Sequence, residues 1–459
     1  SRALSGRHAS GAIIANSIQA GQGTAIIKSI NGEYVGNSLV SKSKIMDASG
    51  GVISNSVDGK GNAFVGIGYT LDKDNTIVSG GDAILGTYKN NYVYSTELSA
   101  NGGVIANYIE KSIEKNDKVQ IGNINASFDG NYVISDKDSA YGGAISNFYV
   151  KGISDENYKN AIIESINSTF ENNFAETKST ESSKGAYGGA ISNIGIIKVI
   201  NNSIFRNNYA MSAGGSNAFG GAIYTGQDLA INANNKGLTE FTGNYVSVDG
   251  RATKNYEAIY VNGANKTLTL NAETKGTILM NDYVNGVAGY NVSLTGDSTG
   301  IIKLFDKADI KGGANVTVGE NVIIDTADGA IQKFSEFKSL KSSESAKYNI
   351  DVDLSGVSGD KSDYVVGEIA DGFTTKDSLS GFVTLDSLNF VADSIGDIEG
   401  KNLKIQILQN NDNKNNLQLA LSDNLASYTS TAGSLAQVKT EESKDLTSTV
   451  NYKDSFGTI

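Results

Sequence analysis

The sequence predicts an all-β fold, a parallel β-solenoid in which short strands stack in successive coils. Two alternating motifs carry this prediction. One is a glycine doublet followed by a small residue and isoleucine, as in AYGGAISNIG (Ala186–Gly195), and the other is Phe-x-x-Asn, as in FRNN (Phe205–Asn208). Regular alternation of this kind is typical of repeat proteins. The length of 459 residues exceeds one ordinary globular core and fits an elongated array.

Both motifs recur in strict and degenerate versions. The glycine motif is found at Ser10–Asn16, Gly50–Asn55, Gly81–Gly86, Gly102–Asn107, Tyr141–Asn147, Gly188–Asn193, Phe219–Ile223 and Tyr256–Asn262. The second motif is found at Phe128–Asn131, Phe170–Asn173, Phe205–Asn208 and Phe241–Asn244, with Tyr replacing Phe at Tyr34–Asn37 and Tyr88–Asn91. We take Phe64 to mark one further cycle that lacks the Asn.

One cycle, from Gly188 to Gly220, illustrates the predicted coil. It holds three short strands, AISN, IIKVI (Ile196–Ile200) and NSIFRNN (Asn202–Asn208), followed by a Gly/Ser/Asn-rich connection. Three such strands need roughly 20–25 residues with their turns. Observed spacings of 32 (188 to 220) to 46 (142 to 188) residues therefore leave room for loops.

The motifs have a structural interpretation in such a stack. Equivalent residues of neighbouring coils lie about 4.8 Å apart, and side chains alternate inward and outward. We expect one inward column of isoleucines and one of phenylalanines, whereas Lys198 should point outward. The columns are Ile53, Ile105, Ile145, Ile191, Ile223 and Ile259, and Phe128, Phe170, Phe205 and Phe241.

Glycine and asparagine are expected at the corners. The doublet allows backbone angles that a Cβ forbids. Asn147, Asn193, Asn173 and Asn208 suit corners because Asn tolerates left-handed geometry, and their stacked amides can bond to the coils on either side.

The rest of the chain divides around this array at residues 11–262. Residues 1–10, SRALSGRHAS, are atypical and resemble a cloning or cleavage remnant, and residues 263–400 read as tighter coils with a polar loop at Lys341–Lys347. Within residues 401–459, two alternating segments flank Gln409–Asn415 and predict a capping hairpin. From Asp423 onward the chain reads as a polar linker.

Composition narrows the function. With 38 basic against 50 acidic residues and a net charge of −12, no basic stripe favours nucleic acid. No Cys is present, which excludes disulfides and thiolate metal sites. No apolar run of about eighteen residues or signal peptide is visible, so we expect a mature or excised segment.

Parallel β-helices also include polysaccharide lyases and glycosidases, which need acid/base groups. The candidate carboxylate pairs are Asp72 with Asp74, Asp136 with Asp138, and Asp351 with Asp353. Their polar neighbours favour solvated loops or outward faces, and no D-x-D-x-D-G calcium loop occurs. His8, the only histidine, lies outside the predicted repeats, and no G-x-S-x-G motif occurs. We therefore assign no catalytic, cofactor or metal residue and expect no cofactor; the binding residues are not identifiable.

GGAI alternating with Phe-x-x-Asn resembles the repeats of chlamydial polymorphic membrane proteins and, more broadly, the passenger domains of bacterial autotransporters, the type V secreted proteins. The resemblance spans residues 11–262 and implies a right-handed parallel β-helix on a Gram-negative cell surface, exported through the outer membrane. The family's membrane β-barrel is not visible here, so we expect membrane attachment only through a barrel missing from this chain. The family members often carry cysteines, which this chain lacks, so the broader label fits better.

The resemblance implies a non-catalytic adhesin or self-association module. Its partner would be a receptor or glycan on a host or neighbouring cell, or a second copy. A carbohydrate-active enzyme and a passive surface spacer stay open as alternatives. Insertions at equivalent places of each coil should emerge along the same edge. We therefore expect partner contacts on the loop-bearing edges of residues 100–220, at Glu110–Lys118, Lys151–Asn160, Glu176–Ala186 and Met211–Ala218.

Overall fold

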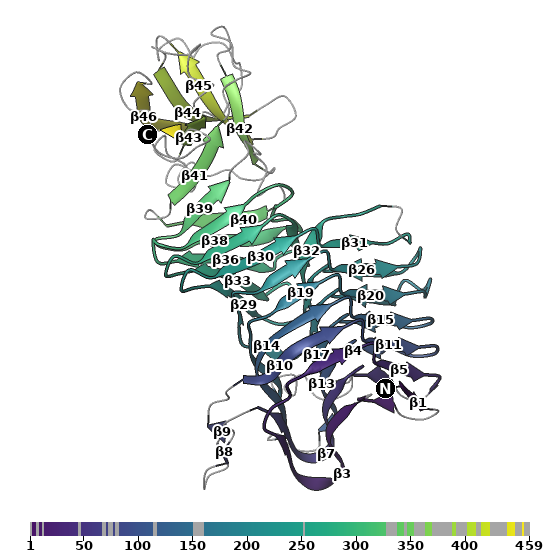
Figure 1. Cartoon of the computed structure of the whole chain (residues 1–459). Coiled ribbons are helices and arrows are strands. Elements are labelled where there is room, and N and C mark those ends of the chain that lie inside the picture. Colours follow the sequence, from purple (N-terminus) through teal and green to yellow (C-terminus); the bar gives the residue numbers. More distant parts are fainter. Residues whose placement is uncertain are drawn as a thin grey trace.

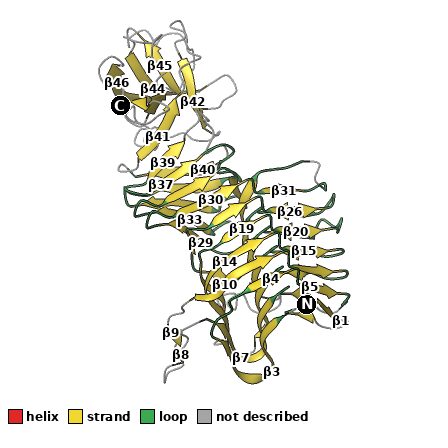
Figure 2. Cartoon of the chain, viewed as in Figure 1, coloured by secondary structure: helices red, strands yellow, loops and turns green. Residues whose placement is uncertain are grey.

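A computed structural model gives the structure of the chain. It describes residues 2–326 apart from 6–8, 12, 45–46, 67–69, 72–76, 79–81, 113–116, 150–159 and 251–252. Further on it describes 337–343, 347–352, 363–369, 388–391, 402–409, 415–422, 438–445 and 452–453. The elements in these ranges are all β-strands (Figure 2). No helix among them is long and apolar enough to cross a membrane.

Three parallel sheets form the body (Figure 1). Sheet A contains β1 (Arg2–Ser5), β5 (Ser38–Ser41), β11 (Tyr92–Ser95), β15 (Tyr132–Ser135), β20 (Phe174–Thr177), β26 (Tyr209–Ser212) and β31 (Tyr245–Ser247). Sheet B contains β2 (Ala9–Ser10), β6 (Ala48–Ser49), β12 (Ala100–Asn101), β16 (Ala140–Tyr141), β21 (Gly185–Tyr187) and β27 (Asn217–Phe219). Sheet C holds the remaining parallel strands up to β41 (Lys347–Val352), together with β43 (Leu388–Val391) and β47 (Tyr452–Lys453).

As far as β27, each pass of the chain visits sheets A, B and C in turn, and each strand pairs with its equivalent in the next pass. One pass runs through β15 and β16 and then through β17 (Ile145–Tyr149), β18 (Ala161–Ile166) and β19 (Thr169–Glu171) of sheet C. The prediction of three strands per coil is therefore too low. It treated the strands of sheets A and B as connections, because strands of two to four residues are too short to give a clear periodic signal.

The isoleucine column is confirmed. Ile53, Ile105, Ile145, Ile191, Ile223 and Ile259 pair in register and are fully buried. The phenylalanine column is confirmed as well, and it continues through Tyr88 to Tyr34. Its rings stack with centroids 4.7–5.2 Å apart. Lys198 is exposed, as expected, and its Nζ lies 2.6 Å from the Glu164 carboxylate.

A second, narrower core lies between sheets A and B. Valine, leucine and alanine on the inner face of sheet A, such as Val93 and Ala175, pack against alanines of sheet B, such as Ala100 and Ala186. Because these side chains are small, the two sheets can approach closely, and every second residue of sheet A is left to face outward.

The glycine doublets form the predicted corner. The first glycine adopts a positive φ, as in Gly142 (65°) and Gly188 (70°). The second packs against the next pass: a Cβ on Gly143 would lie 2.1 Å from the Gly189 carbonyl oxygen. No side chain fits there without moving the backbone.

The predicted corner role of the asparagines is partly wrong. The left-handed residue of Phe-x-x-Asn is the one before the last Asn, either Asn, as in Asn172 (φ 57°), or Gly, as in Gly130 (φ 64°). The last Asn instead forms a buried amide ladder, in which each Nδ2 donates to the next Oδ1 from Asn37 through Asn91, Asn131, Asn173 and Asn208 to Asn244. A second ladder joins Asn16, Asn55, Asn107, Asn147 and Asn193.

Two motif assignments are wrong. Tyr88 pairs directly with Tyr34, so no cycle lies between them for Phe64 to mark. Phe64 instead pairs with Gln120 and Ile26. The GDAILG segment at Gly81–Gly86 is not a corner copy either, because Ile84 pairs with Ile124 outside the isoleucine column. Both errors come from one long pass, whose insertion mimics an extra cycle.

The N-terminal segment is also reassigned. Arg2–Ser5 pairs in parallel with Ser38–Ser41 in sheet A, and Ala9–Ser10 pairs with Ala48–Ser49 in sheet B. Residues 2–5 and 9–10 therefore belong to the first pass and are not a separate segment. His8 lies outside the described residues.

In the second half of the chain the passes become shorter, and the strand pairing then changes from parallel to antiparallel. Sheets A and B end at β31 and β27, after which sheet C continues through shorter passes such as β33 (Thr267–Ala272), β36 (Asn291–Gly296) and β38 (Ala314–Val318). The hairpin strands β44 (Asn402–Gln409) and β45 (Asn415–Ser422) pair antiparallel. They are flanked by β42 (Asp363–Ile369), placed by the sequence in the tight coils, and β46 (Val438–Asp445), placed in the linker. Both placements are corrected.

Candidate functional site

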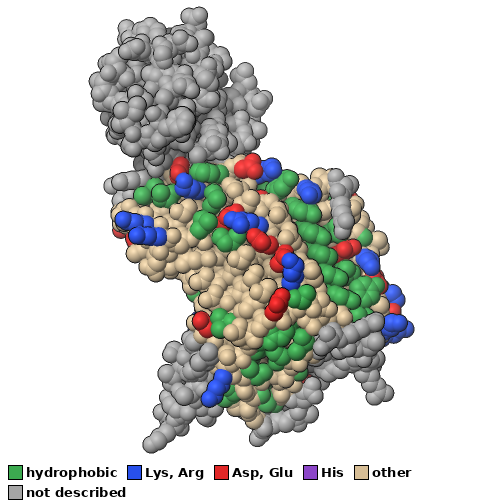
Figure 3. Space-filling model, in the orientation of Figure 1, with side chains coloured by type: hydrophobic (Ala, Val, Ile, Leu, Met, Phe, Trp, Pro, Cys, Tyr) green, Lys and Arg blue, Asp and Glu red, His purple; other side chains and the backbone are tan. Residues whose placement is uncertain are grey.

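The outer face of sheet A carries a continuous row of aromatic rings. The first residue of five successive strands points away from the core and is half-buried, and we call this row the aromatic strip: Tyr92, Tyr132, Phe174, Tyr209 and Tyr245. Ring centroids lie 4.7–5.1 Å apart, with planes 2–10° from parallel. In Figure 3 a band of hydrophobic side chains follows strands β11 to β31. The register of the parallel sheet thus builds one extended apolar surface.

A second outward column runs beside the strip. At the third residue of β5, β11, β15, β20 and β26 it holds Val40, Tyr94, Ile134, Glu176 and the buried Met211. The Tyr94 hydroxyl donates to the Asp136 carboxylate, and this hydrogen bond raises the pKa of Tyr94. Lys178 Nζ lies 5.2 Å from the Tyr94 ring centroid. Glu176 is the one charged residue in the two columns as described.

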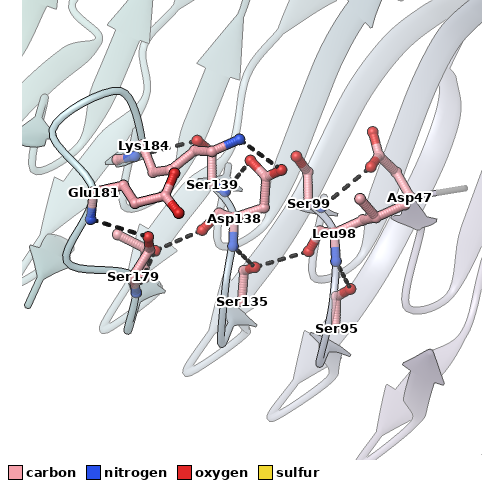
Figure 4. A network of polar contacts seen from close by, with 12 residues as sticks. Asp47, Ser95, Leu98, Ser99, Ser135, Asp138, Ser139, Ser179, Glu181 and Lys184 are labelled. Carbon is pink, nitrogen blue, oxygen red and sulfur yellow. Dashed lines mark hydrogen bonds and ion pairs between the residues drawn. The ribbon is translucent and has the colours of Figure 1, made fainter. Parts of the chain in front are cut away.

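A polar edge follows directly after sheet A. We use the name turn edge for the turns at 95–99, 135–139, 177–185 and 212–217, the first three of which lie side by side in Figure 4. Hydroxyl groups link them: Ser135 Oγ donates to the Leu98 carbonyl at 2.8 Å, and Thr177 Oγ1 donates to the Asp138 carbonyl at 2.6 Å. The longer turns are joined too, because Asn217 Nδ2 donates to the Ser182 carbonyl at 2.9 Å. Insertions therefore emerge along one edge here, as the repeat predicts.

The two carboxylates of the candidate pair Asp136 and Asp138 form ion pairs with different lysines on this edge. Asp136 lies 2.9 Å from Lys178 Nζ, and Asp138 lies 2.9 Å from Lys184 Nζ. Burial acts to raise the pKa of Asp136, but hydrogen bonds from Tyr94 and Lys178 outweigh it and lower the pKa. Asp136 is thus held as an anion that links its own pass to the passes on both sides.

Asp47 lies beside the turn edge, hydrogen-bonded to its first turn, and was missed by sequence reasoning. It occupies the position that Ser99 and Ser139 hold in later passes, and its Oδ1 accepts a hydrogen bond from the Ser99 amide at 3.1 Å. Burial raises its pKa to about 6. The signal was present in the sequence, since Asp47 precedes the same Ala-x-Gly-Gly pattern as these serines.

Two further carboxylates, Glu257 and Asp282, lie where the regular passes end. Glu257 replaces the second glycine of the corner; its carboxylate accepts from the Gly220 amide at 2.7 Å and from Asn285 Nδ2 at 2.8 Å. Burial raises its pKa to about 7. Asp282 follows Asn244 in the amide ladder and accepts from its Nδ2 at 2.9 Å. Burial raises the pKa of Asp282 to about 6.

The other predicted positions contribute little to this picture. Asp72, Asp74 and Asp353, together with residues 151–159 of the Lys151–Asn160 loop, lie outside the described residues, and Asp351 is described only as part of β41. In the described part of the chain no group of three Asp, Glu or His side chains could hold a metal ion. The candidate site is therefore a surface, formed by the aromatic strip and the adjoining turn edge.

No family model, curated protein or solved structure matches this chain. Inference about its function accordingly starts from this surface and from the repeat that builds it.

Proposed function

We propose that the chain is the passenger domain of a bacterial autotransporter, displayed at the cell surface as a non-catalytic adhesin or self-association module. Its sheets would form a right-handed parallel β-helix with a three-sided coil, closed at one end by the antiparallel strands β42 and β44–β46. Partners would be a receptor or glycan on a host or neighbouring cell, or a second copy of the chain.

The aromatic strip is the observation that carries this proposal. Single apolar residues on a surface are ordinary, but contiguous apolar patches on soluble proteins usually mark interaction sites. Here five rings from five passes form one uninterrupted row. A rigid scaffold that presents such a row beside polar turns is suited to binding. A spacer would need no such row.

Functional tests should separate binding from catalysis. Beads coated with the chain are assayed for binding to cells and for mutual aggregation, while the soluble chain is screened for depolymerisation of polysaccharides. A variant with a Gly-Ser turn in place of Thr180–Lys184 should bind less, because this segment belongs to the turn edge. The control replaces the turn Glu273–Gly276, which lies outside the edge. Polysaccharide cleavage, or absence of any binding, would overturn the proposal.

A further inference from the structure

The aromatic strip presents ring edges to its surroundings. Each interior ring lies between two neighbours whose planes are nearly parallel to its own, at centroid distances of 4.7–5.1 Å. Both faces of Tyr132, Phe174 and Tyr209 are therefore covered by rings of the same row. A sugar packs on the face of an aromatic ring, so these three positions offer a glycan no stacking platform. A partner must instead meet a row of ring edges, four of which belong to tyrosines and carry a hydroxyl group.

The spacing of the row selects the partner further. Contacts along all five rings require a partner that repeats with the same period, about 4.8 Å, which is the separation of paired strands. Identical sheet faces can interdigitate along their whole length because their periods are equal. A second copy of this chain meets that requirement by construction, while a globular partner or a flexible peptide does not.

Charge points to the same partner. The chain has a net charge of −12, so two copies repel one another over most of their surface. The outward positions of β11, β15, β20 and β26 carry one charge, on Glu176. Two copies can therefore approach at this face with few charges opposing one another.

We infer that two copies of the chain associate through the outer face of sheet A, aromatic strip against aromatic strip. This inference rests on the proposed function and names the partner and surface for its self-association form. Closed dimers have two-fold symmetry. An axis along the stack of passes sets each pass beside its own copy in antiparallel strand direction, so that Glu176 does not face its own copy directly.

The absence of cysteine from the chain allows a direct test. Phe174→Cys puts a single thiol at the centre of the strip, and mild oxidation should convert most of the 459-residue chain to a disulfide-linked dimer. Ile204→Cys is the matched control, because Ile204 is a half-buried outward residue of β25 (Ile204–Arg206) in sheet C. That variant should stay monomeric.

Sedimentation equilibrium of the unmodified chain supplies the second measurement. The wild type should show a concentration-dependent dimer, Phe174→Lys should weaken dimerisation at least tenfold, and Ile204→Lys should leave it unchanged, with circular dichroism checking that both variants fold. A monomer at all concentrations together with no cross-link at position 174 would overturn the inference. If such a monomer still bound cells, the adhesin proposal would stand without the dimer. A chain that neither dimerised nor bound cells would refute the adhesin proposal and the dimer together.

Discussion

Removing one amide from the buried ladder should destabilise the array far more than removing its exposed neighbour. The Asn173 side chain takes part in four hydrogen bonds. Its Oδ1 accepts from the amide nitrogen and the Nδ2 of Asn131, both at 3.0 Å, and its Nδ2 donates to the Phe128 carbonyl and to Asn208 Oδ1, both at 2.9 Å. The residue is fully buried, so water cannot replace these partners.

The expected magnitude follows from that count. A buried hydrogen bond contributes about 1 kcal/mol net, and an orphaned buried partner costs more. Asn173→Ala should therefore lower the free energy of unfolding by about 4 kcal/mol. Asn172→Gly is the control: Asn172 has φ 57°, Gly130 and Gly243 occupy the same left-handed position in other passes, and its one side-chain hydrogen bond, to Asp129, is exposed. We expect a change of less than about 1 kcal/mol there.

Hydrogen exchange is the assay suited to a repeat array, because such arrays can open locally. Amides of β15, β20 and β26 should exchange much faster in Asn173→Ala and at the wild-type rate in Asn172→Gly, and urea unfolding should show the same order. If both variants behaved alike, the ladder would not be a stabilising element and the reasoning would be wrong.

Two further predictions concern the core and the buried carboxylate Glu257. Ile191→Asp should lower the free energy of unfolding by several kcal/mol, because it places an unpaired charge in a fully buried column. Lys198→Asp should lower it by only about 1 kcal/mol, because it replaces a surface ion pair with Glu164 by a repulsion. Equal losses of Tm would contradict the assigned orientations. Burial raises the pKa of Glu257 from its usual 4.5 to about 7, so its stabilising contribution is full below pH 4.5 and is lost as pH rises through 7. Glu257→Gln should flatten the decline of Tm over that interval, whatever its effect on absolute stability; an unchanged slope would refute the titration.

The ladders and columns could be predicted because periodicity exposes them. Ile191 and Phe205 recur at fixed places in a motif, and parallel pairing turns each recurrence into a column with no further information. Sheets A and B could not be predicted in the same way. Strands such as Ala140–Tyr141 have two residues, and their existence depends on neighbours already stacked on either side.

The aromatic strip left a signal that the motif analysis passed over. From Asn91 to Asn244, the last residue of each x-x-Asn motif is followed directly by Tyr or Phe, as in FENNF and FRNNY. The outward direction of these rings could not be read from the sequence. Which residues of a strand face inward depends on the left-handed corner just before it, such as Asn172 before β20. Glu257 and Asp282 were missed for another reason: each is a single departure from the repeat, visible only when the passes are aligned in space.

The amide ladder also has a direction, and this explains where the regular array stops. Each Asn donates through Nδ2 to the following pass, and each from Asn91 onward accepts through Oδ1 from the preceding one. Each pass therefore requires an acceptor ahead of it. Asp282 supplies that acceptor to Asn244 but has no amide with which to donate onward. Sheet A makes its last strand at Tyr245–Ser247, directly after Asn244. An Asp in place of Asn at position 282 therefore accepts the hydrogen bond of the last ladder amide, on Asn244, and asks for no acceptor in the next pass. The chain can then continue in narrower passes of sheet C that lack the Phe-x-x-Asn motif.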